Sequence, residues 1–170
     1  MQHNSQHIIL TACPMVWRLS FCYDDIYALV STETGYEDNR ASDINGTKQV
    51  MMDDDKPLFN YYLSIAISDL TGLLVRRMVP KLGIRLPDGS TINESIEETA
   101  DNVTFYLLMD ENHEEQLLPS MHRYCTNFLV KRVLEQWYRQ QGMSDSAKAA
   151  IIRVVEFRRK PVRRRVRNFL

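Results

Sequence analysis

The stretch EEQLLPSMHRYCTNFLVKRVLEQWYRQQG, residues 114–142, decides the fold of this chain. Its apolar residues recur every three or four positions, which predicts an amphipathic helix from about residue 114 to 141. Gly142 follows at the place where glycine often caps the C-terminus of a helix. Pro119 either begins this helix or kinks its first turns. The apolar face of the predicted helix consists of Leu117, Met121, Cys125, Phe128, Leu129, Val133 and Trp137.

A second helix is predicted upstream of the first. Apolar residues recur at helical spacing from Leu58 through Met78. Asp55 can cap the N-terminus of this helix, and Pro57 suits its first turn. Pro80 ends it, because proline cannot continue a helix.

Several segments have the residue pattern of β-strands. Residues 16–23 partly alternate between apolar and polar side chains. Residues 103–109 are nearly all apolar or aromatic, which indicates a well-covered strand. Residues 82–86 and 91–96 flank a Pro-Asp-Gly-Ser turn at 87–90, which predicts a hairpin. Strands so few and so short leave open sheet edges, which a neighbouring copy of the chain can complete.

The segment between the first strand and the helix after Asp55 is predicted to be mostly loop. Asp24 and Asp25 place negative charge where a helix N-terminus favours it, which predicts a short helix as far as about Ser31. Residues 33–55 are polar and acidic, and Asn45-Gly46 within them is a turn signal. We therefore expect a long loop over about 33–55.

The C-terminal residues are strongly basic. Residues 153–170 contain eight Lys or Arg and one acid, Glu156, so they carry +7, and residues 1–152 carry about −8 because the whole chain carries −1. A last helix is predicted over about 144–155, and Pro161 ends it. Opposite charges on body and tail indicate an acidic partner, which is nucleic acid, an anionic membrane or another copy of the chain. Apolar residues between the arginines favour an arm laid in a protein groove, and these are Val162, Val166, Phe169 and Leu170.

Together these elements predict a mainly α-helical α+β fold. The predicted architecture is a helical bundle with short edge strands and a hairpin, followed by an extended basic C-terminal arm. At 170 residues the chain fits one domain. We expect a single globular helical domain over residues 1–152, and the end of the last helix with the basic arm over residues 153–170.

The sequence contains no recognisable pattern of a catalytic or metal site. Its four histidines form no H-E-x-x-H motif, and glycine-rich nucleotide motifs and the serine elbow are absent. Asp53-Asp54-Asp55 lacks the spacing of a calcium loop and is interpreted as a solvated loop with a helix cap. Three scattered cysteines indicate free thiols. We expect no enzyme, no metal and no cofactor, and also no transmembrane helix because no run of 18 apolar residues exists.

Three short segments, in this order, resemble a family of phage proteins. They are Asp24-Asp25-Ile26-Tyr27, Glu135-Gln136-Trp137-Tyr138 and Phe157-Arg158-Arg159-Lys160-Pro161-Val162-Arg163. Over residues 16–165 the chain resembles small virion proteins of tailed phages that infect gut Bacteroidales, including the crAss-like phages. In function it resembles the head-to-tail connector class (adaptor or neck ring), whose members are small, helical and form rings beneath the portal.

This resemblance implies a structural protein of the virion, assembled in the cytoplasm of the bacterial host. Its implied partners are copies of itself in a ring, the portal, the tail or neck proteins, and packaged DNA in the channel, with no membrane. A ring subunit needs side-to-side interfaces that close and no catalytic group. The residues that we nominate for the interface lie in the arm and are Arg158, Arg159, Arg163, Arg164 and Arg165.

The alternative is a small nucleic-acid-binding protein that uses the basic C-terminal tail. Reading of bases would need a recognition helix, whereas the basic segment is a terminal arm that contains Pro161. Tyr61-Tyr62 and Trp137-Tyr138 offer base-stacking platforms, but aromatics on amphipathic helices are more often core or interface residues. Protein is therefore the favoured partner of the arm, and DNA the alternative.

Overall fold

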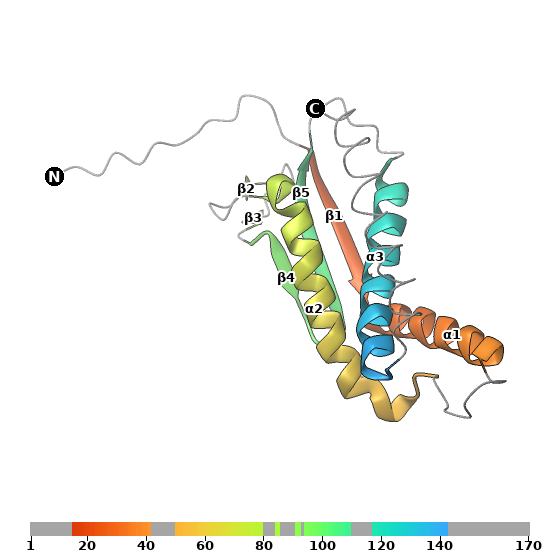
Figure 1. Cartoon of the computed structure of the whole chain (residues 1–170). Coiled ribbons are helices and arrows are strands. Elements are labelled where there is room, and N and C mark those ends of the chain that lie inside the picture. The colour runs from red at the N-terminus through yellow and green to blue at the C-terminus, as the bar shows by residue number, and fades with distance from the viewer. Residues whose placement is uncertain are drawn as a thin grey trace, which may run out of the picture.

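The computed structural model describes residues 15–41, 50–79, 84–85, 91–92, 94–109 and 117–142. These residues are mostly helical and include a small antiparallel sheet, which confirms the predicted α+β class (Figure 1). The helices are α1 (Tyr23–Ala41), α2 (Lys56–Leu74) and α3 (Leu117–Gln140), with the short 3-10 helices η1 (Asp53–Asp55) and η2 (Val75–Arg77) at either end of α2. The strands are β1 (Met15–Cys22), β2 (Ile84–Arg85), β3 (Thr91–Ile92), β4 (Ile96–Glu98) and β5 (Asn102–Met109).

Among the described residues, the main sheet has three strands in the order β1-β5-β4, and both pairings are antiparallel. The register of β1 and β5 runs from Met15 opposite Met109 to Cys22 opposite Asn102. Side chains of a strand alternate between the two faces of a sheet, so one face of this pair is buried throughout. The buried side chains on that face are Trp17, Leu19, Phe21, Val103, Phe105, Leu107 and Met109.

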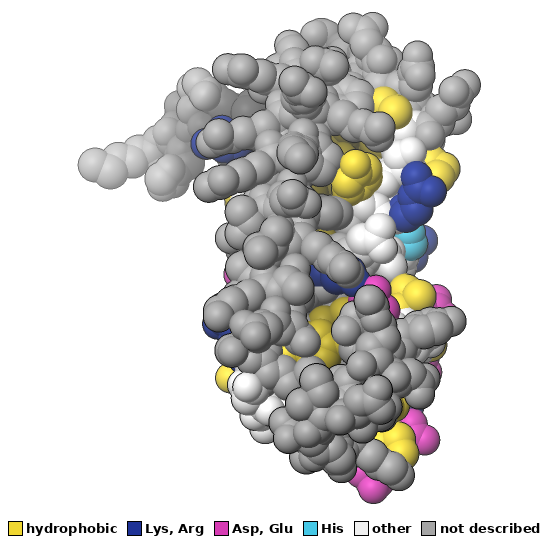
Figure 2. Space-filling view, turned by 45° about the vertical axis from the view of Figure 1, so that its right-hand side comes forward, with side chains coloured by type: hydrophobic (Ala, Val, Ile, Leu, Met, Phe, Trp, Pro, Cys, Tyr) yellow, Lys and Arg dark blue, Asp and Glu magenta, His cyan; other side chains and the backbone are white. Residues whose placement is uncertain are grey.

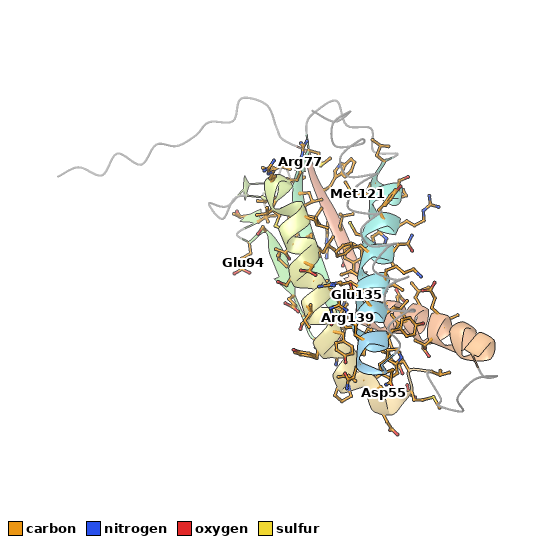
Figure 3. The ribbon with its side chains drawn as sticks, in the orientation of Figure 1. Asp55, Arg77, Glu94, Met121, Glu135 and Arg139 are labelled. Atoms are coloured by element: carbon orange, nitrogen blue, oxygen red, sulfur yellow. The ribbon has the colours of Figure 1, made fainter. Side chains whose placement is uncertain are left out.

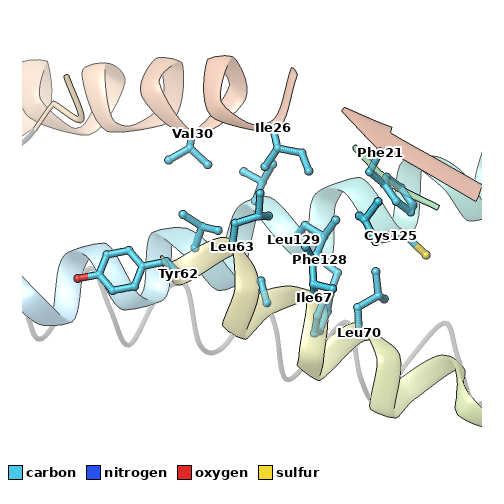
Figure 4. Close-up of a cluster of buried hydrophobic side chains, with 14 of the residues drawn as sticks. Phe21, Ile26, Val30, Tyr62, Leu63, Ile67, Leu70, Cys125, Phe128 and Leu129 are labelled. Carbon is cyan, nitrogen blue, oxygen red and sulfur yellow. The ribbon is translucent and has the colours of Figure 1, made fainter. Parts of the chain in front are cut away.

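Helices α2 and α3 run side by side over the sheet, and α1 packs across the end of α3 (Figure 1). Figure 4 shows Ile26 and Val30 of α1 pointing toward Leu63 of α2 and Leu129 of α3. All four side chains are at most 1% exposed. Burying a large aliphatic side chain fully stabilises a fold by about 1.5–3 kcal/mol, so this cluster holds the three helices together.

The expectation of a loop over 33–55 is wrong for residues 33–41, because α1 continues to Ala41, and for 53–55, which form η1. Residues 42–49 lie outside the described residues. The polar residues of the segment 33–41 bond to the body of the protein. The buried Thr34 hydroxyl accepts a hydrogen bond from the backbone N–H of Met51 (3.1 Å) and donates one to the Ser31 carbonyl (2.9 Å). The Glu33 carboxylate pairs with Lys131 of α3. Polar composition here therefore marks a helix anchored by side-chain bonds, and not a solvated loop.

Several other predictions are confirmed within the described residues. The predicted strands at 16–23 and 103–109 are β1 and β5, and Asp24 and Asp25 lie in the first turn of α1. Pro119 lies in the first turn of α3, which begins at Leu117. Gly142 has φ of 72°, and its N–H donates to the Arg139 carbonyl (3.2 Å), as a C-terminal cap requires.

The predicted hairpin is confirmed only in its short paired part. Ile84 pairs with Ile92 in a separate two-stranded sheet. Ile96, predicted as the end of this hairpin, instead begins β4, which pairs with β5. The hairpin's turn at 87–90 and the predicted last helix at 144–155 lie outside the described residues.

One described helical segment, Asp53–Arg77, is long and apolar enough to cross a membrane by length and composition. We expected no such segment from the apolar runs in the sequence. A core helix of a globular protein passes the same test, and Leu63, Ala66 and Leu70 of this segment are buried in the core. Its apolar character is therefore weak evidence for a membrane span.

Candidate functional site

The most informative surface of this protein is the outer edge of β1. Tyr106 of β5 donates its backbone N–H to the Ser95 carbonyl (2.9 Å), and its carbonyl accepts from the Val79 N–H (3.0 Å), so both groups point away from β1. Arg18 lies opposite Tyr106 in the register. In an antiparallel ladder the backbone groups of such a pair both point outward, so the N–H and C=O of Arg18 face the open edge. The same alternation turns Val16 and Ser20 outward.

Part of this edge is closed by His122 of α3. Its Nε2 atom lies 2.8 Å from the Ser20 carbonyl oxygen, and its ring stacks on Phe21 with centroids 4.7 Å apart and planes 19° apart. The Ser20 carbonyl is therefore occupied within the molecule. Among the residues that the structure describes, no strand pairs with the remainder of the edge, around Val16 and Arg18.

The opposite edge of the sheet is β4. The Thr99 N–H donates to the Asn102 carbonyl (2.9 Å), and Glu97 lies opposite Thr104. By the same alternation Glu97 bonds toward β5, while the backbone groups of Ile96 and Glu98 point outward. No described strand pairs with them on that side.

The middle of the sheet face that points away from the helices is polar. Ser20 and Thr104 share a hydrogen bond between hydroxyls (3.0 Å), and the Tyr106 hydroxyl donates to the Glu97 carboxylate (2.7 Å). The hydrogen bond to Glu97 and burial raise the pKa of the Tyr106 hydroxyl, and the nearby Arg18 lowers this pKa by a smaller amount. A cation thus lies at the β1 edge and an anion at the β4 edge of one polar face.

A cluster of paired charges joins α2 to α3. The Arg132 Nε atom bonds to the Asp69 Oδ2 (2.7 Å), and Arg132 also pairs with Glu135, which is 2% exposed. Arg139 Nη2 bonds to the other Glu135 oxygen (2.8 Å), and Figure 3 shows Glu135 and Arg139 on successive turns of α3. Burial lowers the pKa of Arg132, but its bonds to Glu135 and Asp69 outweigh this and raise it. The four charges balance, so this cluster is a structural link and not a catalytic dyad.

An acidic end of the molecule forms where α1, η1 and α2 begin. Asp24, Asp25, Asp53 and Asp54 are exposed there, and Figure 2 shows acidic side chains (magenta) at the lower end of the visible face. Asp53 accepts a hydrogen bond from the Tyr27 hydroxyl (3.3 Å), and Asp24 lies 3.5 Å from the Lys56 Nζ. This end carries excess negative charge on the body of the protein.

Asp55 caps a different helix from the one predicted, the short helix η1 and not α2. Its carboxylate accepts from the Met52 N–H (2.9 Å) and so caps η1, and it makes no side-chain cap bond to α2. Met52 and Leu29, which are 52% and 46% exposed, add apolar surface near these acids.

The described residues contain no group of three His, Cys, Asp or Glu side chains placed to hold a metal ion. Cys125 is a free thiol on the buried face of α3, and burial raises its pKa to about 12, which makes it a packed side chain and a poor nucleophile. Trp137 and Tyr138 are buried, as is Tyr62, which confirms their interpretation as core aromatics; Tyr61 is 62% exposed.

The five arginines nominated for the interface lie outside the described residues, as do residues 1–14. Their role stays a prediction. The sheet edges carry no sequence motif, and only the small number and the shortness of the predicted strands indicated them.

Comparison with family models, with curated proteins and with solved structures finds no match to this chain.

Proposed function

We propose that this chain is a structural subunit of a virion, a head-to-tail connector (adaptor or neck ring) protein of a tailed phage that infects gut Bacteroidales. It links the portal to the tail by protein–protein contacts and does no chemistry. The observation that supports this most is the sheet, whose two different outer strands, β1 and β4, have no partner strand on their outer sides among the described residues. Interfaces between unlike surfaces of identical copies close into rings when the rotation between copies is right. The resemblance in sequence implies the position of such a ring, which is beneath the portal.

The charges of the chain support the same proposal. The arm at residues 153–170 carries +7, whereas the exposed acids of α1 and η1 give the body a negative end. Arginine pairs with carboxylates through two parallel hydrogen bonds, which suits a docking arm on a neighbouring copy or on the portal.

The test is the mass of the purified protein by light scattering, alone and with a candidate portal. The connector function predicts a closed oligomer, or one that forms on the portal, and a variant lacking residues 157–170 that stays folded but loses assembly or docking. A protein that stays monomeric at high concentration and does not bind the portal would contradict the proposal.

A nucleic-acid-binding protein is the second candidate, since eight Lys or Arg lie within residues 153–170. It predicts tight binding of duplex DNA at physiological salt, lost on deletion of residues 157–170. Its affinity would fall steeply with salt, because each neutralised phosphate releases counterions. The connector function, in which the arm binds protein, predicts weak DNA binding under the same conditions.

A further inference from the structure

The two open edges of the sheet are suited to each other. Strands β1 and β4 both run antiparallel to β5, so they run parallel to one another. In a ring whose axis runs along these strands, the strands of every copy point in the same direction. The β4 edge of one copy therefore meets the β1 edge of its neighbour as a parallel strand, and the sheets of successive copies become continuous.

The hydrogen-bonding groups on the two edges are complementary in number and spacing. In a parallel ladder one residue bonds through both its N–H and its C=O to the two residues that flank its partner in register. Arg18 turns both groups outward from β1, and Ile96 and Glu98 turn theirs outward from β4. Arg18 can donate to the Ile96 carbonyl and accept from the Glu98 N–H of the next copy. The residue in register with Arg18 is then Glu97.

The side chains of this pairing are also complementary. Arg18 and Glu97 both lie on the polar face of the sheet, so the register places opposite charges side by side. On the other face Ile96 of the next copy lies beside Trp17, which extends the apolar side of the sheet.

Other pairings of these edges are disfavoured. A shift by two residues toward Ser20 needs a carbonyl that already bonds His122. A shift the other way places Val16 beside Glu97 and forms no charge pair. Pairing of β1 with β1 of another copy, centred on Arg18, opposes two like charges, which is destabilising, and would end at a dimer.

We infer that the copies of this protein join edge to edge, with β4 of one copy added in parallel to β1 of the next and Glu97 in register with Arg18. This inference rests on the proposed ring and specifies the interface between neighbouring subunits of that ring. The partner is a second copy of the same chain.

A charge exchange tests this interface. Arg18→Glu and Glu97→Arg should each raise the protein concentration needed for assembly at least tenfold. The double variant should assemble like the natural protein, and so should an equal mixture of the two single variants if the ring holds an even number of copies. Arg76→Glu reverses an exposed charge on η2, outside strands β1 and β4, and is the matched control. Tyr106→Phe controls for the loss of the bond to Glu97 within one copy.

Circular dichroism separates a folding defect from an assembly defect, and rescue by the double variant excludes the former. If the natural protein assembles and both single variants assemble equally well, the edge pairing is wrong while the ring survives. If the natural protein stays monomeric with and without the portal, the proposed function fails as well.

Discussion

His122 and Ser20 lie 102 positions apart in the chain, yet the imidazole Nε2 of one lies 2.8 Å from the backbone carbonyl of the other. This bond ties α3 to the edge of β1 and limits the open edge to the part around Val16 and Arg18. Along β1, the described residues thus leave one short stretch of backbone, around Val16 and Arg18, with no partner strand on its outer side.

Replacing His122 by Ala tests this link. The variant loses one hydrogen bond and the stacking contact with Phe21, so we expect the free energy of unfolding to fall by about 1–2 kcal/mol. Urea unfolding measures it. Arg123→Ala, one position further along α3 and exposed, is the control and should change stability by less than about 0.5 kcal/mol. Equal stabilities of the two variants would show that the bond does not hold the edge.

Replacing Glu135 by Ala should destabilise the protein by about 3 kcal/mol. The carboxylate is 2% exposed and bonds two arginines, and its loss leaves the half-buried Arg132 with Asp69 alone. Arg139→Ala removes a partner whose side chain is 55% exposed, and should cost less than about 1 kcal/mol. Chemical denaturation of both variants checks this order. A smaller loss for Glu135→Ala than for Arg139→Ala would contradict the buried-cluster account.

Thr34→Val keeps the shape of the side chain but removes the acceptor of the buried Met51 N–H. An unsatisfied buried donor costs about 1–3 kcal/mol, so stability should fall by that amount. Hydrogen exchange should also quicken in the C-terminal half of α1, because this bond anchors it. Thr32→Val, at an exposed position on the same helix, is the matched control. Unchanged exchange in Thr34→Val would show that this bond does not anchor α1.

Cys125 gives the folded protein a pH dependence of known sign. Burial raises the pKa of its thiol from 9.0 to about 12, so the folded state holds its proton where the unfolded state loses it. The stabilisation is full below pH 9 and is lost as the pH rises toward 12, with a limiting slope of about 1.4 kcal/mol per pH unit. Cys125→Ala should lack this component of the alkaline slope. Parallel slopes of the two proteins between pH 9 and 12 would contradict it.

The long helices and the two main strands could be predicted from the sequence because their signals are local. Apolar spacing marks α2 and α3, Gly142 marks the end of α3, and the aromatic run of β5 marks a covered strand. The extension of α1 to Ala41 could not be predicted in this way. Its polar residues become helical through bonds to Met51 and Lys131, which are distant in sequence.

The candidate interface was only partly predictable. Open sheet edges follow from the shortness of the strands, but which backbone groups point outward depends on the register with β5. The separation of β4 from the hairpin, and the pairing of Arg18 with Tyr106, appear only in three dimensions. The basic arm was plain from composition, but composition does not identify its partner.

The most direct test of the edge-to-edge ring is a double variant that carries Arg18→Cys and Glu97→Cys in the same chain. Its two cysteines should form disulfides between neighbouring copies. Neighbouring strands lie about 4.8 Å apart, within reach of a disulfide, whereas β5 separates the two positions of one copy by about twice that distance. Mild oxidation should therefore give a ladder of covalent oligomers on a non-reducing gel, absent from each single variant. A double variant that assembles but stays at the size of one chain after oxidation would contradict the account.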